Sequence, residues 1–332
     1  MHTIRVGLVA DPASPTLVAR RITDLSPPPR AEADDWSIDL VSEPFTLGSE
    51  AVDTALERLR AHADKNDWAL VVGVTELPLR DDDGRYLLAA IDPQRQSAVL
   101  SLPALGGFRV QDRARRAVRG LVNDMAEPTT PEEQLLPLPG PSARWRVLLG
   151  MVLANRPWRL AAGLKSALVA ALATGAAATI QSTIWSLADS LSGWRLAAAT
   201  FASIAIVIAW IVIDGKLWDR PDDDSPEARD RSRLYNTSTL LTLIFGVVIC
   251  YLALYIVNLA WALFVLDPEV ISETLGRTIT HGDLFVLTWF VASVATLGGA
   301  LGTGLESDEA IRAATYSKRE EERRARLAGE GG

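Results

Sequence analysis

Cysteine and histidine are scarce in this chain of 332 residues. Its one cysteine, Cys250, lies inside an apolar run, which excludes an intramolecular disulfide and argues against a reactive thiol. The three histidines, His2, His62 and His281, belong to widely separated stretches and have no paired spacing for a metal. We therefore expect no metal site and no cofactor.

Signatures of phosphate binding and of nucleophilic catalysis are also missing. The stretch VGLVADPAS (residues 6–14) follows a predicted strand as a dinucleotide loop would, but it lacks G-x-G-x-x-G. The chain has no G-K-[ST] phosphate loop, and Ser101 has no G-x-S-x-G setting. A membrane-anchored enzyme would therefore need an unrecognised site, and this stays an alternative.

Positive charge is in deficit. The formal net charge of −8 excludes a general nucleic-acid binder, which needs a basic surface to neutralise phosphates. The basic residues are nearly all arginine, and together with abundant alanine this is typical of GC-rich bacterial genomes. The N-terminus has no long apolar stretch after a basic start, so we expect the first domain to stay on the side where it is made.

Long apolar runs are abundant, but only in the second part of the chain. A membrane-spanning helix needs roughly 20 apolar residues. Residues 145–305 are therefore predicted to form an all-α transmembrane domain in the lipid bilayer. Its four expected spans are residues 161–188, 195–213, 238–266 and 284–304.

Basic residues in the short flanks predict the orientation. Arginines cluster before the first span, between the second and third, and after the fourth, whereas the other two loops carry only Arg195 and Arg277. Both termini are thus expected in the cytoplasm of a multi-pass protein of the cell (inner or plasma) membrane.

Strongly polar side chains are rare inside the predicted spans. Gln181 and Asn258 are the exceptions, and both are expected in the outer half of the bilayer. They favour a hydrogen bond between the first and third spans, with a polar constriction of a small channel or transporter as the alternative.

Small residues form stripes at helical spacing, which lets helices approach closely. The partner helix lies in the same chain or in a second copy, and the sequence leaves this open. The stripe residues are Gly163, Ala167, Ala171 and Gly175 in the first span and Gly298 and Gly302 in the fourth.

Residues 1–126 are predicted to form a cytoplasmic α/β domain. Apolar, β-rich runs alternate with helical patterns in the order β-α-β-α-β-β-β-α, which indicates a mixed sheet covered by helices. The expected strands are 4–10, 36–41, 68–74, 86–91 and 98–102, and the expected helices are 15–25, 50–62 and 109–126.

The last of these helices has a basic face. Apolar residues follow the i, i+3, i+4 spacing, and four arginines lie mainly off that face. Such a face is usually solvated, and contact with anionic headgroups or a protein partner is the alternative. The arginines are Arg113, Arg115, Arg116 and Arg119.

The stretch VVGVTELPL (residues 71–79), followed by a turn, LLAAIDP, SAVLSLPALGG and an arginine-rich helix, resembles the archaemetzincin-type zincin scaffold over residues 68–125. In that family the helix carries HExxH, whose histidines bind zinc. The matching positions here are Val118, Arg119, Gly120, Leu121 and Val122. The resemblance implies a zincin-like fold whose chemistry has been lost, a pseudoenzyme. The apolar spacing of the helix separately predicts that Val118 and Val122 pack inward on the sheet.

Two charged or proline-rich segments complete the chain. Residues 127–144 contain five prolines and are expected to form a stiff linker. Residues 306–332 are expected to form a charged cytoplasmic tail.

The function that these observations favour is a non-enzymatic one. We expect an integral membrane protein that acts in binding, sensing or scaffolding through its cytoplasmic domain, with a protein partner or as a homo-oligomer. The alternatives are the membrane-anchored enzyme and the small transporter or channel named above.

Overall fold

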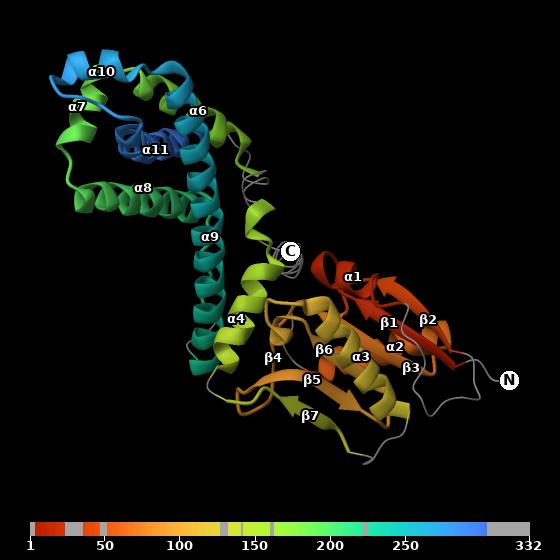
Figure 1. Cartoon of the computed structure of the whole chain (residues 1–332). Coiled ribbons are helices and arrows are strands. Elements are labelled where there is room, and N and C mark those ends of the chain that lie inside the picture. The colour runs from red at the N-terminus through yellow and green to blue at the C-terminus, as the bar shows by residue number, and fades with distance from the viewer. Residues whose placement is uncertain are drawn as a thin grey trace, which may run out of the picture. The chain divides into compact units, whose positions relative to one another are not determined.

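The computed structural model describes residues 4–23, 36–46, 52–126, 132–140, 142–159, 163–221 and 225–303 (Figure 1). They fall into two compact units. The first ends at Asn155 and the second begins at Arg156. The predicted tail 306–332 and residues 127–131 and 141 of the predicted linker lie outside the described residues.

The first unit contains a mixed seven-stranded sheet in the order β2-β1-β3-β6-β5-β4, with β7 paired to β5. Strands β2, β1, β3 and β6 are parallel neighbours, whereas β5 is antiparallel to β4, β6 and β7. The bounds are β1 Ile4–Ala10, β2 Trp36–Ser42, β3 Leu70–Thr75, β4 Leu79–Arg80, β5 Tyr86–Asp92, β6 Ser97–Ser101 and β7 Gln134–Pro137.

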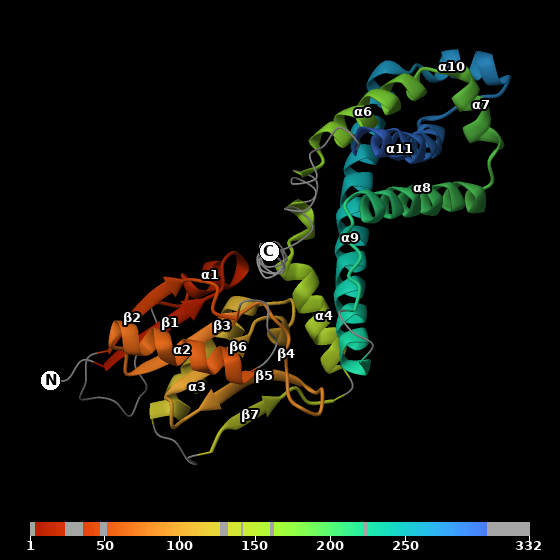
Figure 2. The ribbon, with the colours of Figure 1, turned by 180° about the vertical axis from the view of Figure 1, so that it is seen from behind.

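Helices cover both faces of this sheet, as Figures 1 and 2 show from opposite sides. Alternate strand residues point to opposite faces, and the core divides accordingly. Val72 and Leu100 pack with helices α1 (Ser14–Ala19) and α3 (Val110–Ala126), whereas Val71 and Val99 pack with α2 (Val52–Asn66). The predicted mixed α/β sheet with helices is confirmed.

The helix that the zincin resemblance singled out is α3, and its apolar face lies on the sheet. Val118 is 2% and Val122 is 8% exposed, and both belong to the core on the α1–α3 side, as predicted. Burial of a valine side chain contributes roughly 1.5–3 kcal/mol. These two positions therefore stabilise the sheet–helix contact.

The proline-rich segment differs from the expected spacer. Residues 134–137 form β7 and pair with β5, and helix α4 (Ala143–Ala154) then packs on the 3₁₀ helix η1 (Pro103–Leu105) that follows β6. A Cβ atom on Gly150 would lie 2.2 Å from the Pro103 carbonyl oxygen. The first unit therefore extends to Asn155, well beyond the expected boundary at residue 126.

The second unit is helical. Three of its helices are long and apolar enough to cross a membrane: α8 (Gly193–Asp214), α9 (Pro226–Val265) and α11 (His281–Thr303). The short helix α10 (Pro268–Leu275) joins α9 to α11. At 1.5 Å per residue the 40 residues of α9 extend about 60 Å, which is about twice the hydrocarbon thickness of a bilayer. A membrane crossed by α9 would therefore enclose only part of the helix or hold it tilted.

The first predicted span, 161–188, is not one continuous helix. Helices α6 (Lys165–Thr179) and α7 (Ser182–Ser190) are bent by 86° at the break between them. The pair is either a broken span or a re-entrant segment, so the described residues hold three candidate spans, or four if the pair counts as one. The coarser prediction, several apolar spans after an α/β domain, is confirmed.

Helices α6 and α11 pack closely through small residues. A Cβ atom on Gly298 would lie 2.3 Å from Thr174 Oγ1, and one on Gly299 would lie 3.1 Å from the Ala167 carbonyl oxygen. Ala171 and Gly175 are also buried, Gly163 is half-buried, and Gly302 lies near the end of α11. Within the described residues, the partner of the α6 stripe is therefore a helix of the same chain.

Candidate functional sites

A buried carboxyl group lies at the carboxyl ends of the parallel strands. Asp11 directly follows β1 and is 4% exposed. Its Oδ2 accepts hydrogen bonds from Thr75 Oγ1 at 2.6 Å and Thr46 Oγ1 at 3.0 Å, and its Oδ1 accepts one from the Phe45 amide at 3.2 Å. We call Asp11, Phe45, Thr46 and Thr75 the strand-end cluster. It ties the segment after β2 to the ends of β1 and β3.

The strand-end cluster occupies the position where open α/β sheets usually bind ligands. The chain passes from β1 to β2 on one side and then to β3 on the other, so the strand order reverses at β1. Thr16 Oγ1 extends the polar contacts, with hydrogen bonds to the Asp11 carbonyl at 2.9 Å and Ser42 Oγ at 2.6 Å. Sequence reasoning missed Asp11, although an acidic residue just after a buried strand is the available signal.

The arginines of α3 have separate positions. Arg113 donates to the Leu105 carbonyl at 2.6 Å and so ties α3 to η1, and Arg115 donates to the Arg21 carbonyl at 3.2 Å. Arg116 and Arg119 are exposed. Only the second pair thus lies fully on the solvent side of the helix.

His62 and Asp39 each have partners on the first unit. The ring of His62 is hydrogen-bonded to the Arg58 carbonyl at 2.9 Å and to Glu43 at 3.0 Å. Asp39 accepts from Arg5 at 2.6 Å and from Trp68 Nε1 at 2.9 Å, and these bonds, the Arg5 bond first, hold the pKa of the Asp39 carboxyl below its usual value. Among the described residues, no three His, Cys, Asp or Glu side chains form a group that could hold a metal.

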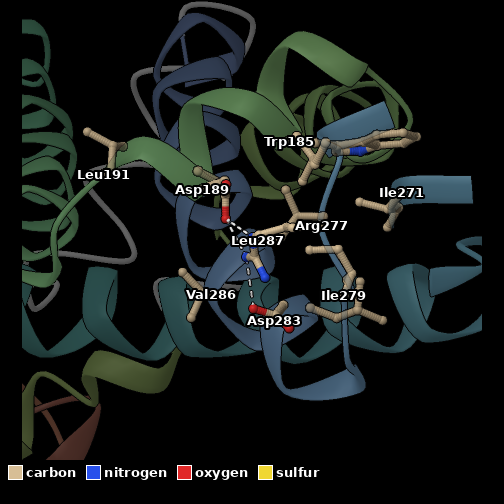
Figure 3. Close-up of a pocket in the computed structure, with 12 residues that line it drawn as sticks. Trp185, Asp189, Leu191, Ile271, Arg277, Ile279, Asp283, Val286 and Leu287 are labelled. Carbon is tan, nitrogen blue, oxygen red and sulfur yellow. Dashed lines mark hydrogen bonds and ion pairs between the residues drawn. The ribbon is translucent and has the colours of Figure 1, made fainter. Parts of the chain in front are cut away.

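A pocket lies in the second unit, between α7, α10 and α11. It has a volume of about 160 Å³ and is lined by apolar side chains such as Trp185, Ile271 and Leu287 together with three charged ones. Its polar side is Arg277, whose guanidinium points toward Asp189 and Asp283 in Figure 3. Arg277 Nε donates to Asp189 Oδ1 at 2.9 Å, and Nη2 donates to Asp189 and to Asp283 Oδ1, the latter at 3.0 Å.

These contacts make Arg277 a clamp between two helices. Asp189 belongs to α7, Asp283 belongs to the first turn of α11, and the hydrogen bonds, that of Asp189 first, raise the pKa of the Arg277 guanidinium above its usual value. Sequence reasoning treated Arg277 only as the single base of an outer loop. A lone base between two acidic helix ends is the signal that it overlooked.

The break between α6 and α7 has its own polar contacts. The indole Nε1 of Trp185 donates to the Thr179 carbonyl at 2.7 Å, and so satisfies a backbone group that the end of α6 leaves free. Gln181 is exposed at the break, and Asn258 donates to the Leu254 carbonyl in its own helix while packing against Gly175. The described contacts include no hydrogen bond between Gln181 and Asn258.

A cluster of four polar side chains joins three of the candidate spans. The indole of Trp289 donates to Thr200 Oγ1 at 2.8 Å, and Tyr251 is hydrogen-bonded to Ser293 at 3.1 Å and to Thr200 at 3.2 Å. It links α8, α9 and α11. Serine, threonine and tryptophan are common in apolar helices of this kind, so no sequence pattern singles these residues out.

Comparisons with protein-family models, curated proteins and solved structures give no match for this chain.

Proposed function

We propose that this chain is a non-enzymatic integral membrane protein whose α/β unit is a binding and sensing module. One observation carries the proposal: α4, which leads toward the apolar helices, packs on η1 at the carboxyl edge of the sheet. Ligands of open α/β sheets bind at that edge. A ligand or protein partner there would act on the helix that connects the sheet to the membrane.

The contact around Gly150 supports a mechanical connection. Gly150 lies against the backbone of Pro103, and Arg113 of α3 is hydrogen-bonded to Leu105. Pro103 and Leu105 belong to η1, which follows β6, a neighbour of β3. A shift of η1 would therefore displace both α3 and α4, because packed interiors transmit displacement.

The finer predictions form part of the proposal. They are the cytoplasmic position of both termini in the cell membrane, and the zincin-like scaffold without its metal helix. The first rests on the distribution of arginines and the second on the sequence stretch 68–125. Reporter fusions after residues 155, 192, 225, 275 and 332 test the first. An externally active reporter at 155 or 332 would overturn it.

A small transporter or channel is the second candidate, and the bent α6–α7 pair favours it. Discontinuous helices commonly line substrate or ion sites in transport proteins. The charged cluster at the pocket beside α7 is closed on itself, however, because Arg277 is already bound by two carboxylates. The sensing role therefore stays the main proposal.

The test uses two glycine variants of the full-length protein in lipid nanodiscs. Gly150→Val forces α4 away from Pro103, whereas Gly120→Val on α3 meets open space and serves as the matched control. We expect Gly150→Val to raise hydrogen exchange in η1 and to lose partners that co-purify with the wild type, as identified by mass spectrometry. Partners retained equally by both variants, or a substrate turned over by the purified protein, would contradict the proposal.

A further inference from the structure

Large apolar side chains are exposed where η1 leads into α3 and along α4. Phe108 is 70%, Trp145 is 67% and Leu149 is 37% exposed. A soluble surface seldom exposes three large apolar side chains on two neighbouring segments of the chain. We call these three residues, together with Arg109 and Arg144, the aromatic patch.

The two chain segments that carry the aromatic patch lie against one another. Trp145 and Leu149 are four residues apart on α4 and so share one face of the helix. A Cβ atom on Gly107 would lie 3.1 Å from Leu149 Cγ and 2.1 Å from Leu153 Cδ1. Phe108 follows Gly107 directly, so its backbone lies near α4, and its side chain is exposed to solvent.

The charge around the aromatic patch is mainly positive. Arg109 has a side chain 83% exposed and is paired with Asp112 at 3.2 Å, and Arg144 is exposed beside Trp145. Gly106 belongs to the same loop, and a Cβ atom on it would lie 3.3 Å from Arg146 Cγ and 3.4 Å from Arg113 Nη1. The four arginines on these segments favour a negatively charged partner.

The chain itself limits where the aromatic patch can be. Ten residues separate the end of α4 at Ala154 from the start of α6 at Lys165. Fully extended, they reach at most about 35 Å. If α6 enters the membrane, the patch is held close to the headgroups at a high effective concentration.

We propose that the aromatic patch docks the α/β unit on the membrane surface, with Phe108 and Trp145 in the headgroup zone and the arginines on anionic phosphates. Aromatic rings prefer this zone, and arginine binds phosphate there. The proposal rests on the apolar helices crossing a membrane. It does not depend on the sensing role, because docking needs no ligand.

The test measures the depth of spin labels on the full-length protein. In a Cys250→Ser background, single nitroxide labels are placed by Phe108→Cys, Trp145→Cys and Gln94→Cys. Gln94 is exposed in the turn before β6, at the opposite end of that strand from η1, and serves as the control. The protein is reconstituted in vesicles of phosphatidylcholine with phosphatidylglycerol, and collisions with oxygen and with a water-soluble nickel complex are compared.

We expect the labels at 108 and 145 to meet oxygen more often than nickel, and the label at 94 to show the reverse. Arg109→Gln with Arg144→Gln should shift the label at 145 toward the aqueous pattern, whereas Arg60→Gln with Arg95→Gln should leave it unchanged. An aqueous pattern at 108 and 145 would overturn the proposal. Exclusion of both reagents would overturn it too, since it would show protein, such as a second copy, covering the patch.

Discussion

The two units differ in how they stabilise carboxyl groups: the first holds a buried one, and the second holds two partly exposed ones. In the first unit Asp11 is 4% exposed and is held by two hydroxyls and a backbone amide. In the second unit Asp189 and Asp283 have side chains 32% exposed and share the guanidinium of Arg277. Hydroxyl and amide donors hold the buried group, whereas a guanidinium bridges the two partly exposed ones, of which Asp283 also accepts from the amide and hydroxyl of Thr280 at 2.8 Å.

Burial, more than the number of contacts, sets how much a polar group contributes to the free energy of folding. A buried donor left without an acceptor loses its solvation as well as its bond, whereas an exposed ion pair can be replaced by water. The strand-end cluster should therefore govern the stability of the first unit. The Arg277 clamp should govern only the local position of α7.

The largest effect is expected from a carboxylate that has no donors. Val118→Asp places a charge in the core on the α1–α3 side of the sheet, where Val118 is surrounded by apolar residues. Leaving such a charge without partners costs about 3–5 kcal/mol, a large part of the stability of a domain. Hydrogen exchange of the β1 and β3 amides should become fast throughout.

Val118→Ala is the control for this change, since it removes volume without adding charge. It should cost about 1.5–3 kcal/mol, the value of the lost burial. Equal effects of the two variants would show that position 118 tolerates water and that the inward packing of α3 is looser than described.

The second largest effect is expected at the strand-end cluster. Asp11→Ala leaves the Thr75 and Thr46 hydroxyls and the Phe45 amide without their acceptor, at a cost of about 3 kcal/mol in total. Asp11→Asn should cost less, because its carbonyl oxygen still accepts and the hydroxyls can rotate to accept from its NH₂ group. Hydrogen exchange at 43–46 and 75–77 measures both. If Asp11→Ala left hydrogen exchange unchanged, the buried carboxyl group would contribute no more to stability than the partly exposed ones.

How far the sequence predicts this molecule depends on the element. The strand 4–10 and the helix ending at 126 match the structure because their apolar spacing is strong and local. The pairing of 134–137 with β5 and the packing of α4 on η1 depend on partners some 45 residues away in the chain. Prolines and a short apolar helix gave no local sign of either.

The candidate sites were harder to predict than the fold. The break at 180–181 lies in a run with no proline or charge, and two contacts accompany it: a local one from Trp185 to Thr179, and a distant one from Arg277 to Asp189 of α7, 88 residues away in the chain. Asn258 was found because it is unusual in a span, but its contact, Gly175, was not. Composition indicates unusual residues, and only the fold pairs them.

A smaller, local effect is expected at the Arg277 clamp. Arg277→Gln removes the bonds to Asp189 and leaves two carboxylates facing each other near the pocket. Hydrogen exchange should rise in α7, residues 182–190, and stay unchanged in the first unit. Arg195→Gln, which removes an exposed arginine from the first turn of α8, is the matched control. A change of hydrogen exchange in the first unit would contradict the independence of the two regions.

The smallest effect is expected at Asp39, which has the geometry of a clamp but is exposed. The side chains of Arg5 and Asp39 are 45% and 39% exposed, so the pair should contribute no more than about 1 kcal/mol. Because the pKa of Asp39 is lowered in the folded state, its contribution is present above the usual aspartate pKa and is lost as the pH falls through the folded value. The stability of the wild type should therefore exceed that of Asp39→Asn at neutral pH, and the gap should shrink only in acid. Thermal unfolding of both proteins across this range measures the gap, and a gap that grows as the pH falls would show that Asp39 is held by something other than its charge.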